Sequence, residues 1–204
     1  MVWGYLFGRL SARALHIDVS LPWLILMGAV PDYDILFQPL GLQHHTISHS
    51  VFAWLLIFVF VVWRWRRRAI AYWIGAVQHL LGDYLVTNVP LALPISDVQV
   101  GLNLGMPSAS DSLLEVGGLG FMLLLLFVSG DWGILMAKAK SNLWMIIPLV
   151  TVLGLSLLVS LDLPLPLVQF AFSRHALSVI TLGHGVLGLL LGVSLLQGLR
   201  LKTD

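Results

Sequence analysis

Apolar residues fall into six runs along the chain, separated by short polar stretches. A helix needs about 20 consecutive apolar residues to cross the hydrocarbon core of a bilayer. The third run is long enough, the last three are long enough or nearly so, and the second reaches that length only if a helix covers 46–65. The pattern predicts an all-α, polytopic membrane bundle of about six helices. The runs cover residues 19–30, 50–63, 69–91, 116–136, 143–161 and 176–196.

The first run, 19–30, is shorter than the others. It could cross the membrane only in part or re-enter it. Its position after Arg9 and Arg13 is also that of a signal-peptide core, but no small-residue cleavage site follows it. We therefore expect a short membrane segment here.

Lysine and arginine residues stand at every second boundary between runs. If all six runs cross, these boundaries share one side, which the positive-inside rule assigns to the cytoplasm. Arg174 is the exception. The pattern predicts a multi-pass plasma (inner) membrane protein with both termini cytoplasmic and with loops 31–48 and 88–115 outside. The basic residues are Arg9, Arg13, Arg64, Arg66, Arg67, Arg68, Lys138, Lys140, Arg200 and Lys202.

Composition supports the same class of protein. Of the 204 residues 58% are hydrophobic and 10% are charged, and the mean hydropathy is +0.93, whereas about 25% of a typical soluble domain is charged. A net charge of +1 argues against a nucleic-acid partner. The absence of cysteine excludes disulfides and thiolate metal sites. We expect one membrane domain over 1–204, with a metal-site half at about 19–95 and supporting helices at about 112–197.

Residues that can bind metal ions are concentrated in the stretch GAVPDYDILFQPLGLQHHTISHS, residues 28–50. Asp32 and Asp34 lie two apart after a proline, and three histidines, His44, His45 and His49, follow. The alternative is a polar end to the first segment followed by solvated loop histidines. A helix beginning near residue 46 would place His49 in its first turn.

The third run carries a second group, HLLGD, in which His79 and Asp83 are spaced four residues apart. This spacing puts both on one face of a helix. Ionisable residues in a membrane helix are costly and usually face an interior with a partner. The pair could therefore ligate a metal, or it could be a hydrogen-bonded pair that holds two helices together.

The remaining histidines and the only glutamate give weaker signals. His16 and His175 are expected to be peripheral, and His184, between glycines, is expected to be buried in the last helix. Ser112-x-x-Glu115 has the pattern of a capping box that opens the fourth helix. Glu115 could alternatively lie near the metal site.

The order and spacing of these motifs resemble the LexA-binding, inner-membrane-associated hydrolase family, also described as membrane-bound metal-dependent hydrolases. That family shows PDxD, then HRGxTHS, then HxxxD, then a PLLxP-like stretch. The resemblance implies a metal site and, less directly, hydrolysis. It covers about residues 28–95, and the matching elements are PDYD (Asp32, Asp34), HHTISHS (44–50), HLLGD (His79, Asp83) and VPLALP (89–94).

The chain departs from that pattern at three positions. His45 replaces the family's arginine, Thr46 its glycine and Ser48 its threonine. A role for the arginine in binding an anionic group would be lost here. His45 could instead add a ligand, or supply positive charge only when protonated.

These observations favour a membrane-embedded, metal-dependent hydrolase that acts at the external face. A water bound to such a metal would lose a proton near neutral pH, and the depth of the site suggests a lipid-like or lipid-linked ester, a phosphoester first. The metal would be Zn, with Mn, Fe or Mg possible, and the number of ligands favours two ions. A non-catalytic protein with a structural metal, or an ion or proton pathway, is the alternative. The expected ligands are Asp32, His44, His49, His79 and Asp83, with Asp34 as base or orienting residue and His45 as a further catalytic residue.

Overall fold

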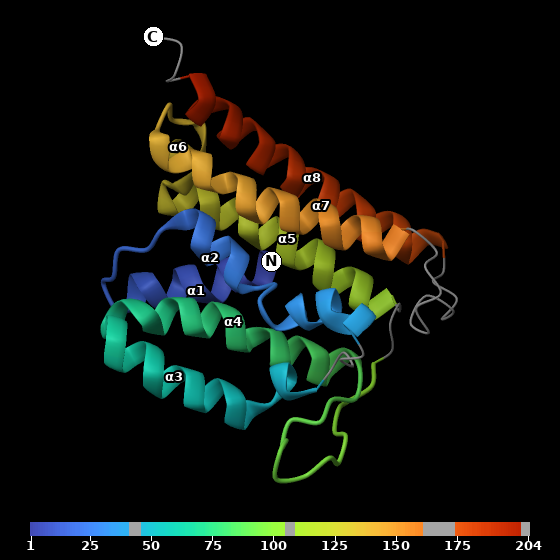
Figure 1. Cartoon of the computed structure of the whole chain (residues 1–204). Coiled ribbons are helices and arrows are strands. Elements are labelled where there is room, and N and C mark those ends of the chain that lie inside the picture. Colours follow the sequence, from blue (N-terminus) through green and yellow to red (C-terminus); the bar gives the residue numbers. More distant parts are fainter. Residues whose placement is uncertain (41–45, 105–108, 161–173, 201–204) are drawn as a thin grey trace. The chain divides into compact units, whose positions relative to one another are not determined.

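The computed structural model describes residues 1–40, 46–104, 109–160 and 174–200, and in these ranges the regular secondary structure is helical apart from one isolated bridge, Val89–Val100 (Figure 1). It divides into two compact units, Met1–Gly105 and Met106–Asp204. The first contains α1 (Val2–Ala14), α2 (Leu21–Met27), the 3₁₀ helices η1 (Pro31–Leu40) and η2 (Ile47–His49), α3 (Val51–Trp65) and α4 (Arg67–Val86). The second contains α5 (Ala109–Ser129), α6 (Asp131–Met136), η3 (Lys140–Met145), α7 (Ile146–Ser160) and α8 (Arg174–Leu199).

Glycines bring three segments of the first unit into backbone contact. A Cβ atom on Gly4 of α1 would lie 2.4 Å from the Cα of Gly28 and 2.8 Å from the carbonyl oxygen of Gly75 in α4. One turn further on, a Cβ on Gly8 would lie 3.0 Å from the carbonyl oxygen of Ala71. Helices α1 and α4 are therefore antiparallel, and only glycine fits at their closest approach.

Helices α3 and α4 pack through a small apolar core joined by two tryptophans. Trp54, Ala76 and Leu80 are buried together. The Nε1–H of Trp73 donates to the carbonyl oxygen of Trp54 over 2.7 Å, and the Phe58 ring lies 4.5 Å from the Trp73 ring. Because buried indoles need a partner for their N–H group, this bond fixes the register of the two helices.

The segment after α4 folds back on the beginning of α3. The backbone N–H groups of Leu102 and Leu104 donate to the carbonyls of Tyr84 and Leu85, and the Val51 N–H donates to the carbonyl of Leu91. The Ser50 hydroxyl caps the first turn of α3 by accepting from two backbone N–H groups. This loop therefore holds the residues that follow His49.

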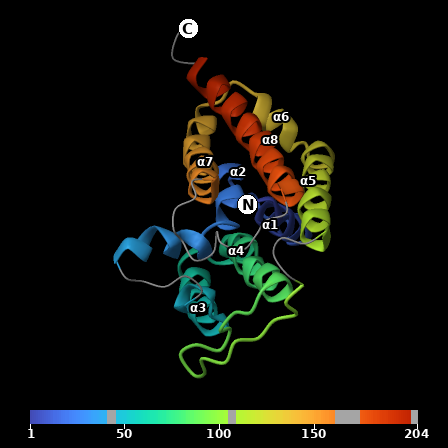
Figure 2. The same cartoon turned by 90° about the vertical axis from the view of Figure 1, so that its right-hand side faces the viewer.

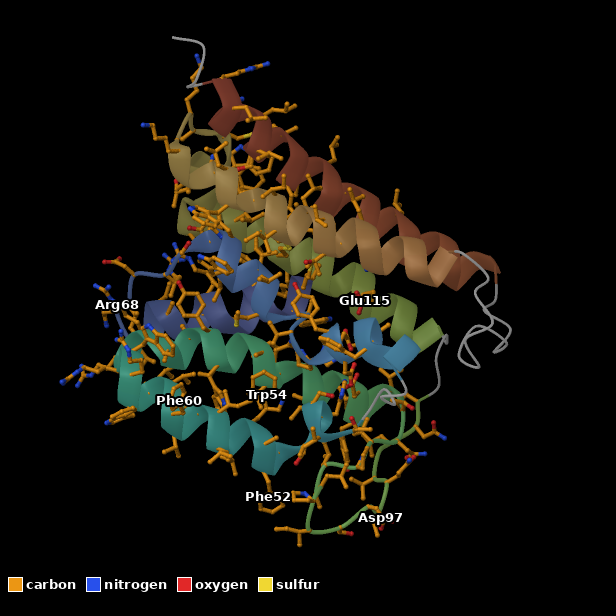
Figure 3. The ribbon with its side chains drawn as sticks, in the orientation of Figure 1. Phe52, Trp54, Phe60, Arg68, Asp97 and Glu115 are labelled. Atoms are coloured by element: carbon orange, nitrogen blue, oxygen red, sulfur yellow. The ribbon has the colours of Figure 1, made fainter. Side chains whose placement is uncertain are left out.

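Charge is separated along the length of the first unit. Because α1 and α3 both run antiparallel to α4, the basic residues of all three helices lie at one end. Asp83 lies about 24 Å from Arg67 along α4, at a rise of 1.5 Å per residue. Figure 3 shows Arg68 and Asp97 at opposite ends of this unit. The basic residues at that end are Arg9, Arg13, Arg64, Arg66, Arg67 and Arg68.

In the second unit α8 packs against both α5 and α7 and lies between them (Figure 2). Gly130, with φ of +80°, ends α5 and lets the chain turn into α6. The Asn142 side chain donates to the carbonyls of Ile134, Leu135 and Ala137. The carbonyl groups at the end of α6 therefore have a hydrogen-bond donor inside the protein. Gly198 lies against the backbone that follows α6, which puts Arg200 beside the segment carrying Lys138 and Lys140.

Among the described residues, one helical stretch, Leu182–Leu199 of α8, is long and apolar enough to cross a membrane. Shorter apolar stretches occur at Val51–Trp65, Leu113–Ser129 and Lys140–Gly154. The all-helical prediction is thus confirmed for the described residues, whereas six crossings stay a prediction. The first run is a seven-residue helix, α2, about 10 Å long and too short to cross by itself.

Five further features differ from the expectations. Helix α1 was not predicted, because its glycines and arginines interrupt the apolar run. The third run ends as a helix at Val86, and the fourth is divided at Gly130. Helix α5 begins at Ala109, so Ser112 lies inside it and does not cap it together with Glu115. His49 lies in the 3₁₀ turn before α3.

Candidate metal site

Three elements of the first unit supply the side chains of the candidate site. Pro31 opens η1, which carries Asp32 and Asp34 in its first turn. The short helix η2 carries His49, and α4 carries His79 and Asp83 on one face. Both η2 and α4 contact η1, so residues far apart in sequence meet at one end of the unit.

Asp32 lies between the two imidazoles. Its Oδ1 atom is 2.9 Å from Nε2 of His79 and 3.7 Å from Nε2 of His49. The two imidazole rings are 5.5 Å apart and meet edge to face. The two Nε2 atoms therefore turn towards the same carboxylate oxygen.

Asp83 approaches the same two nitrogens. Its Oδ2 atom lies 3.2 Å from Nε2 of His49 and 3.4 Å from Nε2 of His79. Two carboxylates and two imidazoles thus converge on one small volume, and a divalent cation between them would balance the negative charge.

Asp34 lies on the opposite side of the His49 ring. Its Oδ2 atom is 3.4 Å from Nδ1 of His49 and accepts a 2.5 Å hydrogen bond from the Ser48 hydroxyl. The Ser48 hydroxyl is also 3.0 Å from Nδ1. Asp34 therefore faces the back of the imidazole, which fits an orienting role better than that of a base.

His49 is the buried centre of the group, with a side chain that is 0% exposed. Burial by itself lowers the pKa of this imidazole. Hydrogen bonds that His49 donates to Asp32 and Asp34, together with the negative charge of Asp83, outweigh that effect and raise the pKa to about 9. The metal-free site therefore keeps a proton on His49 at neutral pH, in place of the positive charge that a metal would bring.

The donor atoms fit a metal ion. One ligand atom each from Asp32, His49 and His79 lies within 4.8 Å of the other two. Two imidazole nitrogens and a carboxylate oxygen form a set typical of Zn sites that leave one position open. This group could hold a metal ion, and the same donor set suits Mn and Fe.

The glycine contacts set the relative positions of the ligands. Gly28 and Gly75, which both pack on Gly4 of α1, lie four residues before Asp32 and His79 respectively. The close approach of these backbones brings η1 next to the face of α4 that carries His79.

The structure brings together five of the seven predicted site residues. Asp32, Asp34, His49, His79 and Asp83 meet as described above, whereas His44 and His45 lie outside the described residues. Sequence reasoning noted Ser48 only as a replacement for threonine and missed its contact with both Asp34 and His49. A hydroxyl next to a candidate ligand was the signal that could have identified it. His184 and Glu115 belong to the second unit.

No protein-family model, curated protein or solved structure matches this chain. The resemblance to membrane-bound metal-dependent hydrolases therefore stays a prediction based on the motifs in residues 28–95. The structure adds one fact that the motifs could not contain, namely that their aspartates and histidines meet in space. The result is a candidate metal centre made of described residues from η1, η2 and α4.

Proposed function

We propose that this protein is a membrane-embedded, metal-dependent hydrolase of the kind that its motifs resemble. One observation carries the proposal: the Nε2 atoms of His49 and His79 and oxygens of Asp32 and Asp83 converge within 2.9–3.7 Å. Uncharged hydrogen-bonding side chains would suffice to hold helices together. Several ionisable groups gathered with their donor atoms facing one point are more typical of a metal site.

Asp32, His49 and His79 are the proposed ligands, with Zn as the preferred ion and Mn, Fe or Mg as alternatives. When bound, such an ion supplies a Lewis acid that polarises a substrate oxygen and lowers the pKa of water from 15.7 towards about 7. Asp83 lies beside both imidazoles and, in this proposal, accepts the proton of the attacking water. Asp34 orients His49 from behind.

The alternative function follows if Asp83 binds the metal instead of accepting a proton. Because its Oδ2 atom is within 3.4 Å of both Nε2 atoms, Asp83 could close the coordination shell as a fourth ligand. A closed shell of four protein ligands is typical of a structural metal. The protein would then bind metal without catalysis.

A lipid-like phosphoester is the proposed substrate class, and the apolar surroundings of the site support it. The short helix η2 also exposes a large apolar side chain close to its ligand. Ile47, two residues before His49, is 59% exposed. An apolar chain beside the ester would cover such a side chain.

Membrane embedding is supported by the outer surface of α3. Its apolar side chains include Leu56 and Trp63, which are 74% and 77% exposed, and Trp54 is the one buried residue that the helix contributes. Lipid would cover this surface. With the arginine-rich end cytoplasmic, as the positive-inside rule requires, the site lies towards the external face.

The test is metal analysis of the purified full-length protein, followed by assay with phospholipid and short-chain phosphoester substrates. We expect one tightly bound Zn or Mn in the wild type, its loss in His79→Ala, and its retention in the control Asp97→Asn, which changes an exposed carboxylate of the same unit. Asp83→Asn separates the two functions. Retained metal with hydrolysis slowed about 10²- to 10⁴-fold supports catalysis, whereas loss of metal supports the structural site.

A further inference from the structure

The back of the His49 ring is held by a hydroxyl and a carboxylate. We propose that Ser48 is a positioning residue that fixes which nitrogen of His49 faces the metal. The proposal rests on the metal site proposed above and adds a role for a residue outside the ligand set. It follows from the positions of three atoms: Ser48 Oγ, Asp34 Oδ2 and His49 Nδ1.

The available hydrogens decide which of these three atoms donates and which accepts. The Ser48 hydroxyl has one hydrogen, and it is donated to Asp34 Oδ2 over 2.5 Å. The 3.0 Å contact between Ser48 Oγ and His49 Nδ1 therefore needs its hydrogen from the imidazole. Nδ1 carries that proton, and when the ring is singly protonated its lone pair is on Nε2, the atom that faces Asp32, His79 and Asp83.

Asp34 makes this arrangement favour one tautomer. An ionised carboxylate only accepts hydrogen bonds, so it orients the Ser48 hydrogen away from the imidazole. Asp34 is also 3.4 Å from Nδ1, which adds a direct attraction for the Nδ1–H group. A carboxylate behind a ligating histidine fixes the orientation of the ring and raises its basicity.

The Ser48 backbone is itself anchored. Its carbonyl oxygen accepts a 2.7 Å hydrogen bond from the Trp54 indole, and the Trp54 carbonyl accepts one from the Trp73 indole of α4. The next residue but one, Ser50, donates its hydroxyl to the Leu93 carbonyl. The η2 turn is therefore fixed to α3, α4 and the loop after α4, which keeps the Ser48 hydroxyl at a constant place behind His49.

The first readout is metal affinity. Loss of a residue that orients a metal ligand typically weakens metal binding 10- to 100-fold, so we expect Ser48→Ala to weaken Zn binding by about that factor in competition with a chelator. Ser48→Thr keeps the hydroxyl and should bind Zn as the wild type does. Thermal unfolding of each metal-free variant shows whether the fold is preserved.

The second readout is the imidazole itself, observed by ¹⁵N–¹H correlation of His49 in the metal-free protein above about pH 9, where the ring carries a single proton. We expect a downfield, hydrogen-bonded Nδ1–H resonance in the wild type and in Ser48→Thr, shifted upfield in Ser48→Ala. A folded Ser48→Ala with wild-type Zn affinity, or with an unchanged Nδ1–H resonance, would overturn the proposal.

The two readouts separate this inference from the proposed function. If the wild type binds no metal, the hydrolase proposal is overturned, and the Nδ1–H resonance of the metal-free protein still decides the role of Ser48. If the wild type binds metal and Ser48→Ala binds it equally well, the metal site stands and the role of Ser48 is rejected.

Discussion

Asp32 of η1 and His79 of α4 meet with 2.9 Å between Oδ1 and Nε2. Their contact follows from the glycines four residues earlier, since Gly28 and Gly75 both lie against Gly4 of α1. Helix α1 carries none of the candidate ligands, yet it sets the distance between two elements that do.

The first prediction concerns this glycine contact. In Gly4→Ala the added Cβ would lie 2.4 Å from the Gly28 backbone, so α1 must move, at a cost typical of overpacking, about 1–3 kcal/mol. We expect a lower unfolding temperature and weaker Zn binding, measured by thermal unfolding and chelator competition. Gly82→Ala is the matched control, because a Cβ there meets nothing within 4 Å. Equal behaviour of the two variants would show that the contact is unimportant.

The second prediction concerns protons released when metal binds. Because the pKa of His49 is raised to about 9, its imidazole is protonated at pH 7.5 in the metal-free protein and must lose a proton to become a ligand. Calorimetric Zn titrations in buffers of different ionisation enthalpy should report release of at least one proton from the wild type. Release of none would mean that His49 is not a ligand.

The same raised pKa predicts how the stability of the metal-free protein depends on pH. A group whose pKa is higher in the folded than in the unfolded state stabilises the fold below its unfolded pKa, about 6.5 for histidine. This stabilisation should be lost as the pH rises through about 9. Thermal unfolding between pH 6 and pH 10 tests this, and His49→Gln should remove the contribution. The same dependence of unfolding temperature on pH in the wild type and in His49→Gln would contradict a raised pKa for His49.

The third prediction concerns the substrate. Replacing Ile47, which is exposed two residues before His49, by serine should raise KM for a long-chain phospholipid. Each apolar side chain covered by the substrate contributes up to about 1.5–3 kcal/mol. The kinetics with a short-chain, water-soluble phosphoester should stay near those of the wild type. Equal losses on both substrates would argue against contact with an apolar chain.

The fourth prediction concerns orientation in the membrane. The chain has no cysteine, so single cysteines can be introduced at the two ends of the first unit, as Asp97→Cys and Arg68→Cys. A membrane-impermeant maleimide added to intact cells should label the first and not the second. Labelling of Arg68→Cys alone would place the site on the cytoplasmic side.

The sequence predicted the helical class and the candidate ligands because both depend on local patterns. Apolar runs show where helices form, and the spacing of His79 and Asp83 places them on one face of α4. Helix α1 escaped prediction because its stability comes from backbone contacts made by Gly4 and Gly8, which appear in the sequence only as poor helix formers.

The role of Ser48 could not be predicted for a related reason. Its meaning depends on atoms of Asp34 and His49 that lie within 3.0 Å of its hydroxyl, and no spacing rule gives such distances. The same holds for Asp34, whose place behind His49 separates it from Asp32 although the two are only two residues apart.

The most direct test of the account is zinc K-edge X-ray absorption on the Zn-loaded, full-length protein. We predict a first shell of nitrogen and oxygen with outer-shell scattering from two imidazoles, and loss of this zinc spectrum in a folded His49→Ala or His79→Ala variant. A zinc spectrum without imidazole scattering, or one that neither substitution changes, would contradict the claim that these two histidines and Asp32 form the metal centre.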